Sequence, residues 1–293
     1  MARLDPVDIF NRLSSDIPAD LRNSFVIVGS LAAAYEFRKN LQGRAVNTKD
    51  ADIVVYPAGN VESAQSMACA LLDHGWRRTE NCTPKPAPDP SDELWAIRLM
   101  PANSNDYFIE FLNVPGEGQT TPKQWIPMKL PDGWYGLPSF MFMGLTLHDK
   151  RTSAEGLYYA SPAMMALANL LSHRRITITE KIQSGAFRGL RRCAKDLGRV
   201  LTLAWLAEDC VTTQWGDQWN DAIRACFPVT WLDHTRRAGA GLRELLEDDE
   251  LMEEAVHTTE IGLLSGKDID VTALRAVGRR LLADVIEDFE NQK

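Results

Sequence analysis

The chain has few cysteines, no long apolar run and no grouped thiols and imidazoles, and each shortage excludes a class of protein. Its five cysteines form no CxxC pair, and their odd number rules out a complete disulfide framework, which favours a reduced, cytoplasmic compartment. The five histidines do not cluster with these thiols, which argues against structural zinc. No stretch approaches the roughly 18 to 20 apolar residues of a membrane helix, and the N-terminus lacks the apolar core of a secretory signal. We therefore expect a soluble protein with no membrane partner.

The composition is that of a globular protein, with 45% hydrophobic and 25% charged residues, and 293 residues suffice for two domains. The net charge of −8 argues against a general nucleic-acid coat protein, although it leaves room for a local basic surface.

The first half of the chain mixes strands and helices, which predicts an α+β fold. Asn60 is a candidate N-cap. Four prolines in 82–92 predict a loop, and the Pro- and Gly-rich stretch 115–139 is expected to be irregular. The apolar patterns predict helices over 5–15, 30–40 and 60–74, strands over 24–28 and 52–56, and a hairpin of strands over 94–100 and 107–113.

The second half reads as helical from Ser161, a capping serine followed by proline at the first helical position. The boundary near residue 155 divides the chain into a mixed domain, 1–155, and an all-helical domain, 156–293. Helices are expected over 161–173, 186–208, 216–226, 239–257 and 270–290.

Gly29 and Ser30 stand where the first strand is expected to end and a helix to begin. The unpaired N–H groups and the dipole of a helix start favour an anion, and glycine allows a phosphate to approach the backbone. The alternative is that Ser30 merely caps its helix.

Three carboxylates are candidates for a metal site. Asp50 and Asp52 alternate along a strand and therefore point the same way, and paired carboxylate oxygens suit Mg²⁺. Glu110 lies within the apolar strand YFIEFL, where a carboxylate needs a partner, a metal or solvent. The alternatives are solvated aspartates at a strand end, and pairing of Glu110 with Arg98 across the hairpin.

Together these motifs resemble the polymerase-β-type nucleotidyltransferase superfamily, and most closely its branch of AbiEii-like toxins of bacterial toxin–antitoxin systems. The resemblance covers roughly residues 24–113. The matching residues are Gly29, Ser30, Ala32, Arg44, Thr48, Lys49, Asp50 and Asp52, with Glu110 in the place of the family's third carboxylate.

The resemblance implies a nucleotidyltransferase-type sheet and a mechanism. Asp50, Asp52 and Glu110 would hold two Mg²⁺ ions, and Gly29, Ser30 and Lys49 would bind the NTP. An acceptor hydroxyl would attack the α-phosphorus and release pyrophosphate, with Glu110 placed to take the proton.

A basic segment in the helical half points to a nucleotide or an RNA. Eight basic residues lie between His173 and Arg199, and a solvated helix face is the alternative. In the toxin-like families this region carries a K/R-D-L run, which Lys195 and Asp196 match. The family's upstream lysine is missing here, where its expected place falls near Asn169, and Arg174 or Arg175 could replace its charge. The acidic stretch 242–256 is expected to be a solvated face rather than a partner surface.

The favoured function is metal-dependent transfer of an NMP to a hydroxyl acceptor, with RNA as the expected acceptor. A toxin role would bring a cognate antitoxin as a further partner. Two alternatives stay open: nucleotidyl transfer to a small molecule, and a non-catalytic nucleotide- or protein-binding module with the same fold.

Overall fold

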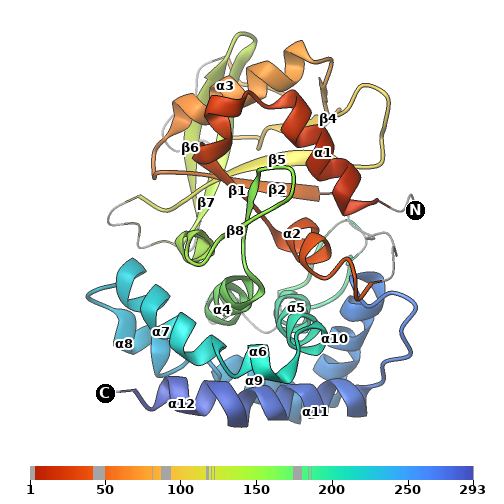
Figure 1. Cartoon of the computed structure of the whole chain (residues 1–293), viewed down its shortest axis with the longest axis vertical. Coiled ribbons are helices and arrows are strands. Elements are labelled where there is room, and N and C mark those ends of the chain that lie inside the picture. The colour runs from red at the N-terminus through yellow and green to blue at the C-terminus, as the bar shows by residue number, and fades with distance from the viewer. Residues whose placement is uncertain are drawn as a thin grey trace. The chain divides into compact units, whose positions relative to one another are not determined.

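The chain forms two compact units, a mixed α/β unit and a helical unit (Figure 1). Unit 1 is Met1–Arg38 with Gln42–Ala160, and unit 2 is Lys39–Leu41 with Ser161–Lys293. The α+β class is confirmed, because a mixed sheet with helices is followed by a helical C-terminal region. The computed structural model describes residues 4–41, 50–80, 82–86, 94–116, 119, 121, 123–173, 180–183, 185 and 187–292.

The sheet of unit 1 combines parallel and antiparallel pairs, and its strands follow the order β3-β4-β5-β2-β1-β9-β8. In this order β2 is antiparallel to β1 and parallel to β5, and β4 is antiparallel to β5. The predicted hairpin is therefore confirmed, with a shorter first strand. The strands are β1 (Phe25–Val28), β2 (Asp50–Val55), β3 (Arg77–Arg78), β4 (Arg98–Met100), β5 (Phe108–Asn113), β8 (Arg151–Thr152) and β9 (Tyr158–Tyr159).

The helices of unit 1 are α1 (Pro6–Asp16), α2 (Gly29–Glu36) and α3 (Val61–Asp73). The predicted cap of α3 is confirmed, because the Asn60 side chain accepts the N–H of Ser63 at 3.2 Å. Buried aromatic side chains join α1 to α2, where the rings of Phe10 and Tyr35 stack with centroids 4.0 Å apart.

The expectation that 115–139 is irregular is wrong, since β6 (Lys123–Leu130) and β7 (Gly133–Phe140) form a long antiparallel hairpin. Met128, Leu130, Tyr135 and Leu137 are fully or almost fully buried, so the hairpin carries an alternating apolar face that the prolines obscure. Proline is tolerated in β6 because this strand pairs with β7 alone in the described sheet, and an edge strand needs fewer N–H donors.

Unit 2 consists of helices packed around aromatic side chains, among them the buried Trp215, Trp219 and Phe289. The helix predicted over 186–208 begins only at Arg192. The helix predicted over 239–257 is divided into two helices, because Asp248 has an extended backbone and caps α10 by accepting the N–H of Leu251 at 2.9 Å. The helices are α4 (Pro162–His173), α5 (Arg192–Leu206), α6 (Asp209–Thr212), α7 (Trp215–Cys226), α8 (Trp231–Thr235), α9 (Ala240–Glu247), α10 (Asp249–Ile261), α11 (Val271–Leu281) and α12 (Glu287–Glu290).

The start of α4 agrees with the prediction in its proline and differs from it in its serine. Pro162 is the first residue of α4 as predicted, but the Ser161 hydroxyl does not cap it, because this buried oxygen has no hydrogen-bond partner among the described residues.

All five cysteines are free thiols. Within the described ranges, no helix is both long and apolar enough to cross a membrane.

Candidate functional site

The strand register of unit 1 brings the three predicted carboxylates to one face and one end of the sheet. Asp52 is the register partner of Glu110 on the parallel strand β5, and of Val28 on the antiparallel strand β1. Asp50 lies two residues before Asp52 on β2, so its side chain leaves the same face. Val28 directly precedes Gly29, so α2 begins beside these carboxylates.

Gly29, the first residue of α2, lies beside Asp52. Its φ of +69° favours glycine, and a β-carbon built on it would lie 3.0 Å from Oδ2 of Asp52. Ser30 is the second residue of α2; the N-cap position is Val28, and no side chain caps the helix. The interpretation of Ser30 as a simple cap is therefore wrong, and its hydroxyl lies at the helix start next to Gly29.

Glu110 adopts the alternative that its sequence context left open, because its Oε2 accepts the Nε–H of Arg98 at 2.5 Å. The Glu110 side chain is 16% exposed and that of Arg98 40% exposed. Within the described ranges, no three His, Cys, Asp or Glu side chains converge into a ready metal site. A carboxylate has two oxygens, however, and the bond to Arg98 engages only one of those of Glu110.

The face that carries the carboxylates is accessible at their end of the strands only, since Val54 and Leu112, two residues further along the same face, are buried. Alternate residues on β2 and β5, such as Ile53, Ile109 and Phe111, are 0% exposed and belong to the core on the other face. Asp50 is exposed, while Asp52 and Glu110 are half-buried. The end of this face that carries the carboxylates therefore reaches the solvent.

Several predicted residues lie outside the described residues, and others lie in unit 2. Arg44, Thr48, Lys49, Arg174 and Arg175 belong to the first group, and Ala32 is buried in α2. Lys195 and Asp196 are half-buried in the first turns of α5, and Nζ of Lys195 lies 5.2 Å from the centroid of the Phe187 ring. Asn169 donates its side-chain amide to the carbonyl oxygen of Met165 at 2.8 Å, within α4.

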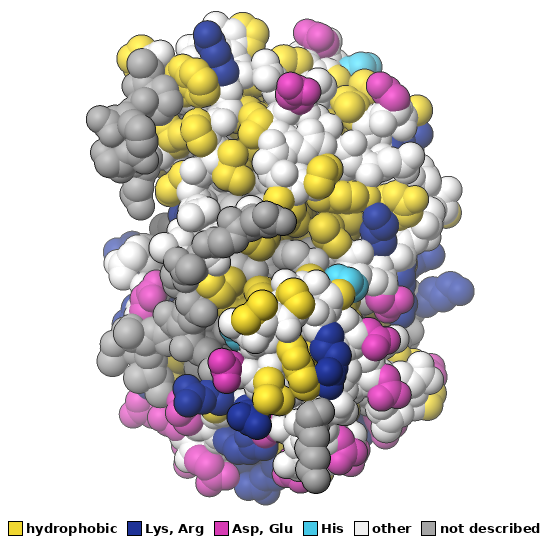
Figure 2. Space-filling view, turned by 90° about the vertical axis from the view of Figure 1, so that its left-hand side faces the viewer, with side chains coloured by type: hydrophobic (Ala, Val, Ile, Leu, Met, Phe, Trp, Pro, Cys, Tyr) yellow, Lys and Arg dark blue, Asp and Glu magenta, His cyan; other side chains and the backbone are white. Residues whose placement is uncertain are grey.

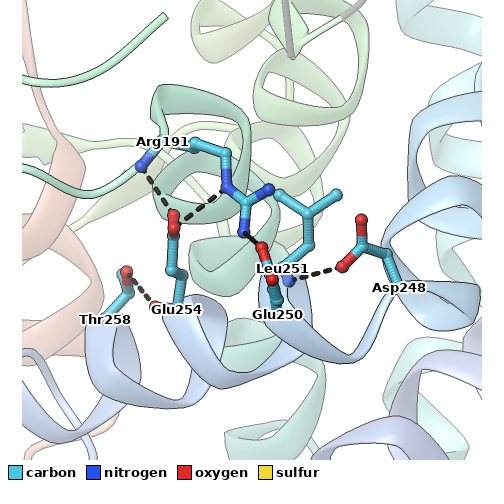
Figure 3. A network of polar contacts seen from close by, with 6 residues as sticks. All are labelled: Arg191, Asp248, Glu250, Leu251, Glu254 and Thr258. Atoms are coloured by element: carbon cyan, nitrogen blue, oxygen red, sulfur yellow. Dashed lines mark hydrogen bonds and ion pairs between the residues drawn. The ribbon is translucent and has the colours of Figure 1, made fainter. Parts of the chain in front are cut away.

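Most acids of the stretch 242–256 are exposed, as expected for a solvated face, and Glu254 is an exception because it binds Arg191 (Figure 3). Glu254 accepts the backbone N–H of Arg191 at 2.6 Å and its Nε–H at 2.9 Å, while the more exposed Glu250 lies 3.5 Å from the same guanidinium. Arg191 is the residue that precedes α5, so Glu254 supplies an acceptor to the start of that helix. At least one of the eight basic residues is therefore structural.

On the face drawn in Figure 2, dark blue and magenta side chains are mixed over the helical unit rather than separated by sign. Arg192 likewise lies 3.7 Å from Glu180. Two of the eight basic residues, Arg191 and Arg192, therefore have acidic partners within unit 2.

We expect the substitution Glu254→Gln to lower the free energy of unfolding by about 1–2 kcal/mol, because two hydrogen bonds to a charged, mostly buried acceptor are weakened. The matched control is Glu253→Gln, one residue away on α10 and exposed, for which we expect a change within about 0.5 kcal/mol. Chemical denaturation followed by circular dichroism measures both values. Equal midpoints for the two variants would contradict a structural role for the Arg191–Glu254 pair.

Comparison with known protein families, with curated proteins and with solved structures found no match to this chain. Function is therefore inferred from the side chains and the strand register of unit 1. The register brings the Gly29–Ser30 turn close to Asp50, Asp52 and Glu110 within unit 1. Lys195 belongs to unit 2.

Proposed function

We propose that this protein is a metal-dependent nucleotidyltransferase that transfers an NMP from an NTP to a hydroxyl group of RNA. The observation that carries the proposal is the register of Asp52 opposite Glu110 on parallel strands, with the Gly29 turn against Asp52 on the other side. Asp50 adds a third carboxylate to the same face. Hard carboxylate oxygens are the ligands that Mg²⁺ prefers, so the donor set fits this ion.

Each residue has a defined task in this reaction. Asp50, Asp52 and the second oxygen of Glu110 would hold Mg²⁺, which neutralises charge on the entering and leaving oxygens. The N–H groups at the start of α2 and the Ser30 hydroxyl would bind the triphosphate. The acceptor oxygen forms a bond to the α-phosphorus, its proton passes to the Glu110 carboxylate, and the bond to pyrophosphate breaks.

The resemblance to AbiEii-like toxins extends the proposal to a biological role. A toxin of this type would modify RNA, arrest growth and be neutralised by a cognate antitoxin. Lys195, Asp196 and Arg174 would then take part in binding the NTP, as the matched run in the family implies. Expression of the chain with and without its neighbouring gene, scored by growth, addresses this role separately from the chemistry.

A specific observation favours one competing function, a non-catalytic nucleotide-binding module. Glu110 is held by Arg98, and the expected place of the family's upstream lysine falls near Asn169, whose amide is bonded within its own helix. Both features would suit a protein that keeps the fold and has lost the reaction.

The deciding experiment is incubation of the purified protein with each α-³²P-labelled NTP and total RNA. We expect label in RNA with Mg²⁺ and none after chelation with EDTA, because the carboxylates alone offer no charge stabilisation to the transferring phosphoryl group. Adding excess Mg²⁺ to the chelated sample should restore the label. No incorporation into RNA, protein or small hydroxyl compounds at any metal concentration would overturn the proposal in favour of the binding module.

A further inference from the structure

The accessible part of the carboxylate face continues from Glu110 across β4 to the β3 edge of the sheet. Arg98 on β4 pairs in register with Glu110, and its carbonyl oxygen accepts the N–H of Thr79 at 3.1 Å. Residues opposite one another on paired strands share a face, as do residues two apart on one strand. Arg77, Thr79, Arg98, Met100 and Phe108 therefore lie on the same face as the three carboxylates.

The part of this face nearest to the carboxylates is suited to an unstacked base. Phe108 is half-buried and is the register partner of Asp50, and the Arg98 guanidinium carbon lies 5.2 Å from its ring centroid. Met100 is half-buried on the next strand. An aromatic ring and a guanidinium plane on an open sheet face are the groups on which single-stranded RNA bases stack.

The outer part of the face offers donors to a phosphate. Arg77 and Arg78 line a surface cavity of about 360 Å³ together with Thr79, Glu80, Met100 and Asn105. Arg77 donates to the neutral amide oxygen of Asn105, so that bond leaves its charge uncompensated. Within the described part of the chain, the buried Oγ1 of Thr79 has no hydrogen-bond partner, whereas Arg78 belongs to the other face of the sheet and pairs with Asp132 at 2.7 Å. Glu80, the one acid in the lining, is exposed.

The spacing between the two parts suits a short oligonucleotide. Neighbouring strands lie about 4.8 Å apart, so β3 is roughly 10 Å from β5. A single strand lying across β4 would bring its terminal hydroxyl to Glu110 while a phosphate reaches Arg77.

We infer that Arg77, Thr79, Arg98, Met100 and Phe108 form an acceptor platform that binds the terminal nucleotides of single-stranded RNA. The inference rests on the proposed function, because it takes the hydroxyl beside Glu110 to be the attacking group. In this arrangement the terminal base stacks on Phe108 and Arg98, and Arg77 binds a phosphate of the preceding nucleotide.

The test compares Phe108→Ala and Arg77→Ala with Phe108→Trp and Lys129→Ala. Lys129 is an exposed cation on β6 of the same unit and serves as the control for loss of charge. Fluorescence anisotropy with a labelled eight-nucleotide RNA gives affinity in the Asp52→Asn background, where RNA is bound without turnover. Steady-state kinetics of each variant with Asp52 intact gives separate KM values for RNA and for NTP.

We expect Phe108→Ala to weaken RNA binding and to raise the KM for RNA about tenfold, and Phe108→Trp to restore both. Arg77→Ala should reduce the slope of log affinity against log salt by about 0.7, while Lys129→Ala leaves it unchanged. The KM for NTP should stay the same in all four variants.

Three further outcomes separate this inference from the proposed function. Wild-type affinity and wild-type KM for RNA in both Phe108→Ala and Arg77→Ala would overturn the platform while leaving the transferase intact. Because Arg77 is exposed, its variant folds even where Phe108→Ala does not. RNA binding that depends on Phe108 and Arg77, in a protein that incorporates no nucleotide, would support the platform and reject the transferase. Loss of kcat with unchanged KM for RNA in these variants would also overturn the platform.

Discussion

The substitution Asp52→Asn is expected to lower nucleotide incorporation about 1,000-fold or more. Several kcal/mol of metal-mediated charge stabilisation are lost, and each ~1.4 kcal/mol changes the rate by a factor of ten. Asp52 is central to the site, since it is in register with Glu110 and its Oδ2 lies against Gly29. Asparagine keeps the size of the side chain and removes only its charge. Single-turnover incorporation of labelled NTP into RNA measures the change.

The same substitution should leave the fold intact, because asparagine occupies nearly the same volume as aspartate in the half-buried position 52. The matched control is Asp73→Asn, which removes an exposed carboxylate at the end of α3. Incorporation by Asp52→Asn at the rate of the control would show that Asp52 holds no catalytic metal.

The positions of the candidate residues on their strands and turn were predictable from the sequence because they follow from local patterns. Alternation along a strand places Asp50 and Asp52 on one face, and the apolar neighbours of Glu110 identify the buried face of β5. Gly29 directly after a buried strand indicates the turn into α2. None of these inferences requires knowledge of which strands pair, and for that reason they held.

Features that depend on tertiary contacts were not predictable in the same way. The β6–β7 hairpin is hidden by prolines that an edge strand tolerates, and only the sheet order reveals that β6 is an edge. The pairing of Arg191 with Glu254 joins residues 63 positions apart, and no local charge pattern specifies it. The choice of Glu110 between Arg98 and a metal was left open because both are compatible with the same strand register.

Glu110→Gln should therefore affect both activity and stability, for two separable reasons. We expect incorporation to fall about 100- to 1,000-fold, because a metal ligand and proton acceptor is lost. We also expect the free energy of unfolding to fall by about 0.5–1 kcal/mol, since the ion pair with Arg98 is weakened. The loss is small because Arg98 is 40% exposed and exposed ion pairs contribute little. Incorporation assays and thermal unfolding measure the two effects on the same sample.

The charge-reversed double variant, Arg98→Glu with Glu110→Arg, tests whether the Glu110 carboxylate acts only through its ion pair with Arg98. It reverses the ion pair across the same β4–β5 register, so thermal stability should return toward that of the wild type. Activity should not return, because a guanidinium at position 110 can neither bind Mg²⁺ nor accept a proton. The corresponding reversal of Arg275 and Asp249, an ion pair of unit 2, should leave incorporation unchanged. Recovery of both stability and incorporation in the Arg98–Glu110 double variant would show that Glu110 only forms the ion pair with Arg98. The metal site would then consist of Asp50 and Asp52 alone.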